Sequence, residues 1–383
     1  MPATDYHASF LGRLSIRRNQ VIAMDGNHEQ ELEDLELFSK HVSECFTELL
    51  SPPDDVPFDT LLSIPWLRKL LDVFLCCEAE FKAIIMMGND SFQISKPPLD
   101  RLIPDLLDRS VKALDICNAV TNGLDSVRHY QKLAEIAASA LEQKPIGDGQ
   151  ARRAKKALNS LMLAMSIDDK DCSAVKTTER SWSFSRRGVN KDRSPGHFRQ
   201  VAKSWSAAKQ IQTMACNLVP PRGAEASGLA SPVYIMSVIM VFVMWALVAA
   251  IPCQDRNGLL ATHFPVPKQL NWDQSIIGLH EKIGEEWKKK EKKGAAGLLA
   301  EMQKMEKLGH NLMEFTESFQ FHGETDEKAA AHAAELAETC RRMEEGLLPL
   351  QVKIREVFHR IVRTRTEFLH ALDQGGKSSA PLV

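Results

Sequence analysis

The residue types that carry out chemistry in enzymes are present in this sequence, but their spacing does not bring them together. There is no G-x-x-x-x-G-K-[ST] phosphate loop and no G-x-G-x-x-G, H-E-x-x-H or G-x-S-x-G motif, so the usual means of holding a phosphate, a metal or an acyl intermediate are missing. The eight cysteines form no C-x-x-C pair, which predicts reduced and mostly buried thiols. We therefore expect a non-enzymatic protein with no catalytic residue, no metal ligand and no cofactor.

Two sets of charged residues stand out. The densest polar set is His359 with Arg355, Arg360, Arg363 and Arg365, which is either a solvated helix face or a site for a phosphate or a lipid headgroup. The second set is acidic and comprises Glu31, Glu33, Asp34 and Glu36. It lacks the Asp/Asn-Gly spacing of a calcium loop, so we interpret it as an exposed helix surface, between Glu29 and Glu48, that is suited to a basic protein partner.

Charge is divided unevenly along the chain. Residues 1–149 carry a net charge of −10, residues 150–230 carry +9, and residues 252–383 carry −1. The basic block directly precedes the most apolar stretch, and a basic stretch beside a membrane gains about 1 kcal/mol per Lys or Arg near an anionic leaflet. This position favours an anionic membrane surface, on the cytosolic side, as the partner of the block.

Within the basic block, residues 168–230 show no helical period and predict a disordered linker. Interleaved aromatic residues also suit single-stranded nucleic acid, but the position beside the apolar stretch favours lipid, so we expect no nucleic-acid partner. Phosphorylation would weaken the lipid contact and act as an electrostatic switch. The candidate residues for lipid contact and phosphorylation are Ser181, Ser183, Ser185, Arg186, Arg187 and Ser194.

The apolar stretch runs from Pro232 to Ile251 without a charged residue. At about 1.5 Å per residue, a helix of this length reaches across a bilayer core of about 30 Å. The residues that define this candidate membrane segment are Pro232, Tyr234, Val241, Trp245 and Ile251. The alternative is a central helix that neighbouring helices cover on every side, because such a helix is also apolar all round.

Elsewhere apolar residues recur at steps of three and four, and no alternating strand pattern of any length is present. The pattern predicts helices over residues 27–49, 63–87, 100–141, 150–167, 273–292, 295–321, 329–345 and 347–373, with a break in the third at Asn122-Gly123. The fold class is therefore all-α: a multi-helix bundle with long helices, a basic linker and one strongly hydrophobic helix.

These features divide the chain into seven regions. They are an N-terminal arm (1–26), an N-terminal helical bundle (27–167), the basic Ser/Arg-rich linker (168–230), the hydrophobic helix (231–252), a Pro-rich connection (253–272), a C-terminal helical region (273–374) and a tail (375–383).

Several long blocks, in order, resemble the plant-specific BYPASS and ROH-like family, and the similarity is strongest to the ROH branch. They include TDYHASFLGRLSIRRNQV, NHEQELEDLELFSKHV, IPWLRKLLDVFLCCEAEFKAI, SWSFSRR, FPVPKQLNW and EKIGEEWKKKEKKGAAGLLAEM. The resemblance covers nearly the whole chain. It implies no enzymatic activity, and for the ROH branch it implies binding to the seventy-kilodalton exocyst subunit in plant secretion.

Two functional interpretations follow. The first is a membrane-associated adaptor in exocytosis, with a cytosolic N-terminal region and one membrane-spanning helix. The second is a soluble helical regulator of a mobile root-derived growth signal, in which the hydrophobic segment is buried in the bundle. A single span would place the highly charged residues 252–383 on the other side of the membrane from the basic block, which argues for the second architecture.

Overall fold

The computed structural model describes residues 26–50, 60–87, 96–142, 146–166, 205–216, 218–223, 225, 228–253, 273–291, 297–318 and 327–378. Within these ranges the protein forms helices and no strand, which confirms the prediction of an all-α fold. The helices are α2 (Gly26–Leu50), α3 (Ile64–Met87), α5 (Leu99–Glu142), α6 (Asp148–Ser166), α8 (Ala207–Cys216), α9 (Ala230–Ala250), α10 (Gln274–Glu291), α11 (Ala300–Ser318) and α12 (Glu327–Ser378).

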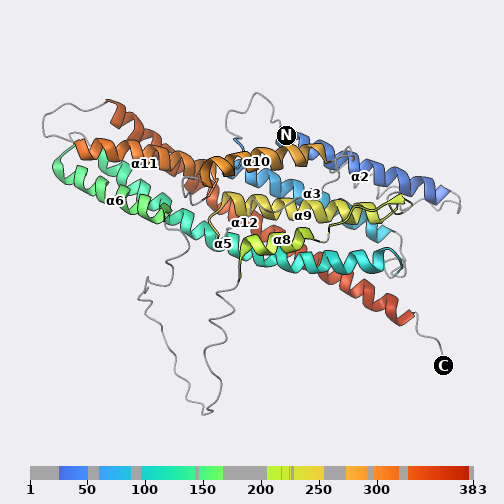
Figure 1. Ribbon diagram of the computed structural model, residues 1–383. Helices are drawn as coiled ribbons and strands as arrows, with labels where there is room; N and C mark the ends of the chain where they lie inside the picture. Colours follow the sequence, from blue (N-terminus) through green and yellow to red (C-terminus); the bar gives the residue numbers. More distant parts are fainter. Residues whose placement is uncertain are drawn as a thin grey trace, which may run out of the picture.

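The two longest helices, α5 and α12, pack against each other along an elongated bundle (Figure 1). They run antiparallel, because Gln131 donates to the Cys340 carbonyl at 3.2 Å while Arg128, earlier in α5, donates to Gln351, later in α12. At one end of the bundle, α6 and α11 pack together beside α5 and α12, and at the other end α2, α3 and α9 lie side by side. Helices from the two halves of the sequence therefore share one structure.

Helix α5 continues through Gly123, so the predicted break at Asn122-Gly123 is wrong. The glycine serves close packing instead. A Cβ atom at this position would lie 2.3 Å from the Pro252 carbonyl oxygen and 2.8 Å from the Ile251 side chain, closer than any real contact. Only glycine lets the end of α9 approach α5 this closely.

The last two predicted helices form the single helix α12, which continues through Gly346 and Pro349. A proline removes one backbone donor and commonly ends a helix, but here the flanking Leu347 and Leu350 are both buried in the core. Gly346 lies against Ile64, whose Cγ2 would be 2.8 Å from an added Cβ. Tertiary packing across α3 therefore outweighs the local preference for a break.

The structure also contains a helix inside the interval that the sequence predicts as a linker. Helix α8 buries Ala207, Ala208, Ile211, Met214 and Ala215 and packs against α5 and α9. Its ten residues are too few to display a clear period. Residues 167–204, which hold the larger part of the predicted linker, lie outside the described residues.

Candidate functional site

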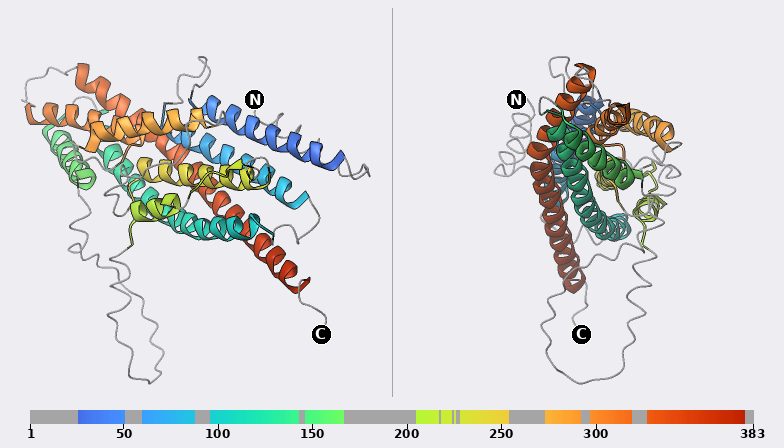
Figure 2. Two further views of the ribbon diagram at one scale, coloured as in Figure 1. Left: turned by 45° about the vertical axis from the view of Figure 1, so that its right-hand side comes forward. Right: turned by 90° about the vertical axis from the view of Figure 1, so that its left-hand side faces the viewer.

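Helix α9 lies in the centre of the bundle, and its contacts come from both halves of the chain. It packs against α2, α3, α5, α8 and α10. In the left view of Figure 2 it is the yellow helix in the middle of the bundle. The aromatic ring of Phe242 meets that of Phe46 from α2 edge-on at 5.8 Å, and Trp245 lies 4.4 Å from the ring of His280 in α10. Aromatic pairs of this kind add about 0.5–1.5 kcal/mol beyond area burial.

The carboxyl end of α9 is also satisfied by protein. Helices leave their last carbonyl groups without intrahelical partners. Here the N–H groups of Leu298 and Leu299 donate to the carbonyls of Ala249 and Ala250, each at 3.0 Å. The segment that leads into α11 therefore closes the end of α9.

Among the described residues, α9 is the one helix that is long and apolar enough to cross a membrane, judged by its length and composition. Its apolar window is 100% buried inside the bundle. The residues singled out in the sequence, Pro232, Tyr234, Val241, Trp245 and Ile251, are all buried. The structure thus matches the alternative of a covered central helix, and the same residues belong to the core.

The acidic set near the N-terminus lies on α2, at the edge of the bundle. Glu33 and Glu36 are exposed, whereas Asp34 is buried, so Asp34 does not belong to the expected exposed surface. The helical turn that places Leu35 and Phe38 in the core also turns Asp34 inward. The side chain of Glu31 lies outside the described residues.

Helical spacing extends the exposed acidic surface beyond the residues chosen from the sequence. Glu44 and Glu48 are exposed on the same face, and Lys40, between Glu36 and Glu44, lies 3.9 Å from Glu44. We call Glu33, Glu36, Lys40, Glu44 and Glu48 the acidic stripe. The sequence pattern placed this surface between Glu29 and Glu48, but its later members were not singled out, because they do not form a compact run; their spacing of three and four residues could have shown them.

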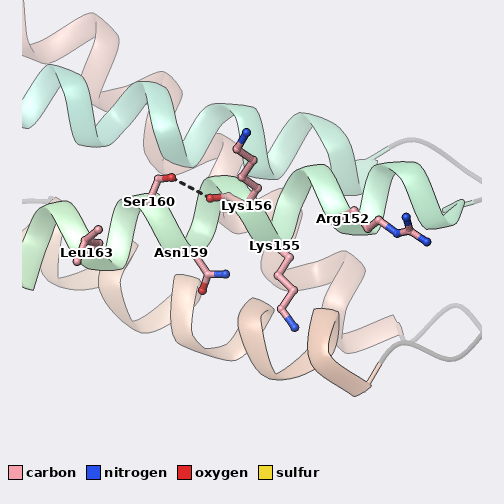
Figure 3. Close-up of a pocket in the computed structure, with 6 residues that line it drawn as sticks. All are labelled: Arg152, Lys155, Lys156, Asn159, Ser160 and Leu163. Atoms are coloured by element: carbon pink, nitrogen blue, oxygen red, sulfur yellow. Dashed lines mark hydrogen bonds between the residues drawn. The ribbon is translucent and has the colours of Figure 1, made fainter.

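Helix α6 is the most basic described part of the basic block, which also includes α8. Its apolar face, including Leu158 and Leu161, is buried, while Arg152, Arg153, Lys155 and Lys156 carry charge at the surface. Figure 3 shows the six residues that line an open hollow of about 410 Å³ here: Arg152, Lys155, Lys156, Asn159, Ser160 and the exposed Leu163. We call this surface the basic face.

Acidic neighbours reduce the charge of the basic face. Arg152 forms an ion pair with Asp148 in the first turn of α6, and the Lys155 ammonium lies 3.7 Å from Glu317 of α11. Exposed pairs of this kind contribute little to stability. The remaining positive charge suits a flexible, anionic surface better than a single tight anion site.

Other predicted sites are separated or fall outside the description. Ser181, Ser183, Ser185, Arg186, Arg187 and Ser194 lie outside the described residues. In the set around His359, Arg355 and Arg363 are exposed with it, but Arg360 turns inward and donates to Glu78 of α3 at 3.2 Å. Burial raises the pKa of Glu78, against the opposing effects of Thr364 and Arg360. The set therefore does not converge on one site.

One cluster of reactive side chains was not found by sequence reasoning. His41 and Cys45 project from α2, and Cys76, Cys77 and Glu80 project from α3. His41 Nδ1 lies 2.8 Å from Glu80 Oε2, its Nε2 lies 3.3 Å from Cys45 Sγ, and Cys76 Sγ lies 3.7 Å from Glu80 Oε1. Donor atoms of His41, Cys76 and Glu80 all lie within 4.8 Å of one another.

The protonation of this cluster follows from its contacts. Hydrogen bonds to Cys45 and then to Glu80 raise the pKa of His41 from 6.5 to about 10, despite partial burial. The contact with Cys77, followed by that with His41, lowers the pKa of the Cys45 thiol to about 6. Burial is the main cause of the raised pKa of Cys76. The buried carboxylate of Glu80 therefore has a positively charged partner.

These observations define an all-helical bundle protein with an apolar core helix and oppositely charged faces on α2 and α6. A family model described as Protein ROH1-like matches residues 1–372. Protein ROH1A from Arabidopsis thaliana is 59% identical over 416 residues, covering 100% of each chain, and Protein ROH1D from the same plant is 42% identical over 408 residues, covering 98% of this chain and 99% of that protein. No solved structure matches. The chain belongs to the ROH1-like family.

Proposed function

We propose that this protein is a non-enzymatic helical adaptor that binds other proteins through its charged helix faces and meets membranes only at its surface. The observation that carries the proposal is the complete burial of α9 by helices that precede and follow it. For α9 to span a bilayer, α2, α3, α5 and α10 would have to leave it and expose their own apolar faces. That rearrangement is costly, since each large buried side chain contributes about 1.5–3 kcal/mol.

The expected partner is the seventy-kilodalton exocyst subunit, as the family resemblance implies. The acidic stripe on α2 supports a partner with a basic surface, because complementary charge steers association and disfavours wrong partners. The exposed members of the stripe lie on one side of α2, opposite the residues that pack on α3 and α9.

Membrane association is peripheral in this proposal. At about 1 kcal/mol per basic residue near an anionic leaflet, the four basic residues of α6 supply at most about 4 kcal/mol, and less because Arg152 and Lys155 have acidic neighbours. A helix face of this strength gives reversible contact and does not anchor a protein alone. The resulting location is the cytosolic surface of the plasma membrane or of an endomembrane.

A second candidate is a regulator of a mobile root-derived growth signal. The burial of α9 favours this growth-signal regulator as much as the exocyst adaptor, because the regulator is expected to be a bundle that never enters the bilayer. The two candidates differ in their partner, so a binding measurement separates them.

The binding test uses the purified full chain and the purified seventy-kilodalton exocyst subunit. In the variant Glu36→Lys/Glu48→Lys, reversal of two exposed stripe charges is expected to weaken binding about tenfold, mainly through slower and less salt-dependent association. The matched control, Glu135→Lys/Glu344→Lys, makes the same change in charge at exposed positions of α5 and α12 and should bind like the unaltered chain.

Equal binding by the stripe variant and the control would remove α2 as the contact surface. Failure of the unaltered chain to bind would reject the exocyst assignment and leave the growth regulator as the candidate.

The membrane test is extraction of cell membranes with alkaline carbonate, which releases peripheral proteins and retains integral ones. We expect the full chain in the supernatant. The variant Val241→Arg, with a charge in the core, should become insoluble or be degraded, whereas Val219→Arg changes a valine that is 65% exposed and should leave solubility unchanged. Retention of the full chain in the pellet, lost on changing Val241, would refute peripheral association.

A further inference from the structure

Two helices each present a pair of metal-binding side chains at a spacing of four residues. Residues four apart lie on the same face of a helix, so His41 and Cys45 project together from α2, and Cys76 and Glu80 project together from α3. Helices α2 and α3 pack against each other. The facing pairs place the His41 and Glu80 donor atoms 2.8 Å apart, although these residues are 39 positions apart in the sequence.

We propose that His41 Nδ1, Cys76 Sγ and the Glu80 carboxylate bind a zinc ion between α2 and α3. The donor set is one imidazole nitrogen, one thiolate sulfur and one carboxylate oxygen, which are the three donor types that zinc takes. Calcium and magnesium require mostly oxygen ligands. A sulfur donor beside an imidazole therefore selects a borderline-soft ion such as zinc.

The distances suit a tetrahedral ion. Zinc bonds of about 2.0–2.3 Å separate neighbouring donors by about 3.3–3.8 Å. The Cys76 and Glu80 donors already lie 3.7 Å apart, and the three donor atoms lie within 4.8 Å of one another. Side-chain shifts of about 1 Å or less would complete the geometry, and binding would displace the Cys76 thiol proton and the Nδ1 proton through which His41 contacts Glu80.

Cys45 is well placed to support the metal from behind. A histidine that binds a metal through one nitrogen usually donates its other N–H to a hydrogen-bond acceptor, which fixes the orientation of the ring. Cys45 Sγ lies 3.3 Å from His41 Nε2, on the side of the ring away from Glu80. The ion would retain one open position for water. Water and metal can reach the site from the His41 side, because the His41 side chain is 16% exposed, whereas the Glu80 side chain is fully buried.

A catalytic cysteine with a histidine and a carboxylate is the other chemistry that this arrangement suggests. Such a site needs a cleft for its substrate. The hollows of 400 Å³ or more that the described residues form beside α5, α6 and α8 are lined by other side chains. A bound ion needs no cleft, so the geometry favours zinc and assigns it a role in fixing α2 against α3.

The test uses the full chain, purified under reducing conditions and freed of metal, and titrated with Co²⁺ and then Zn²⁺. Co²⁺ occupies zinc sites, and a cobalt–thiolate bond gives a near-ultraviolet charge-transfer band. We expect one Co²⁺ per chain with this band and its loss when Zn²⁺ displaces Co²⁺. The variant Cys45→Ser should keep the band and bind metal about 10- to 100-fold more weakly. The variant Cys76→Ser should lose the band and should lose more affinity than Cys45→Ser.

The control is Cys216→Ser, which removes an exposed thiol on α8 and should bind as the unaltered chain does. If Cys76→Ser does not fold, as judged by circular dichroism, Glu80→Gln replaces it: this variant keeps the size of the side chain and the Cys76 thiolate, and it should lose affinity while keeping the band. Unchanged binding by the folded variant, or no band in the unaltered chain, would refute the zinc site. A disulfide between Cys45 and Cys77 in the oxidised protein, without metal binding when reduced, would assign the cluster to thiol chemistry and equally reject the proposal.

Discussion

The burial of α9 makes a quantitative prediction about Phe242. Its ring is fully buried and contacts Phe46 at 5.8 Å and Trp245 at 6.2 Å. Removing a buried phenylalanine to alanine costs about 3–5 kcal/mol, because apolar contacts are lost and a cavity remains. With a denaturant slope of about 3 kcal/mol per M, a loss of about 4 kcal/mol lowers the urea midpoint by about 1.3 M.

The assay is urea unfolding of the purified chain in buffer without detergent, followed by tryptophan fluorescence. The control is Leu163→Ala, at a side chain that is 66% exposed, and it should change stability by less than about 0.5 kcal/mol. The double variant Phe46→Ala/Phe242→Ala should show a coupling of about 0.5–1.5 kcal/mol if α2 covers α9 as described. A Phe242→Ala midpoint equal to that of the control, or no coupling with Phe46, would refute the position of α9 in the core.

Two further predictions concern backbone contact and buried charge. Gly123→Ala should destabilise the protein by about 1–3 kcal/mol in the same urea assay, because the added Cβ would overlap the Pro252 carbonyl. The control is Gly149→Ala, where nothing lies within 4 Å of an added Cβ, and it should be neutral or stabilising by up to about 1 kcal/mol. Equal effects of the two substitutions would contradict the close packing at Gly123. Glu301 accepts a hydrogen bond from the Ile64 N–H at 2.9 Å, but burial raises its pKa above the ordinary 4.5. A raised folded-state pKa means that stability falls as pH rises through it, so the stability of Glu301→Gln relative to the unaltered chain should increase as pH rises above 4.5. A constant difference in urea midpoint would be the contrary result.

The sequence predicts the helices well wherever one face is apolar. Phe38, Val42, Phe46 and Leu49 recur at steps of three and four, and all four are buried in α2. The ends of helices were harder to predict. The sequence pattern predicts helix ends at Gly123 and at Gly346, but both helices continue. The neighbours in space that hold these glycines in a helix, Pro252 and Ile64, are distant in the sequence, so no local pattern contains them.

The candidate sites were predictable to different degrees. Exposure of Glu33 and Glu36 follows from the helical period, but the inward position of Asp34 depends on how widely α2 is covered. The environment of α9 was undecidable from sequence, because a helix that is apolar all round has no face to indicate its solvent. The cluster of His41 and Cys76 joins two helices at a spacing that no linear motif describes.

The central position of α9 also has a consequence for the synthesis of the chain. Helices α2 and α3 leave the ribosome before α9. Helix α10, and the segment before α11 that closes the carboxyl end of α9, are made later. At about 5–20 residues per second, the interval between Ala250 and Leu299 takes roughly 2.5–10 s. Throughout this interval the nascent chain displays its most insertion-competent stretch with an incomplete cover. We therefore expect cotranslational chaperones and the membrane-targeting machinery to compete for the same helix, with the outcome set by how fast the C-terminal half is synthesised.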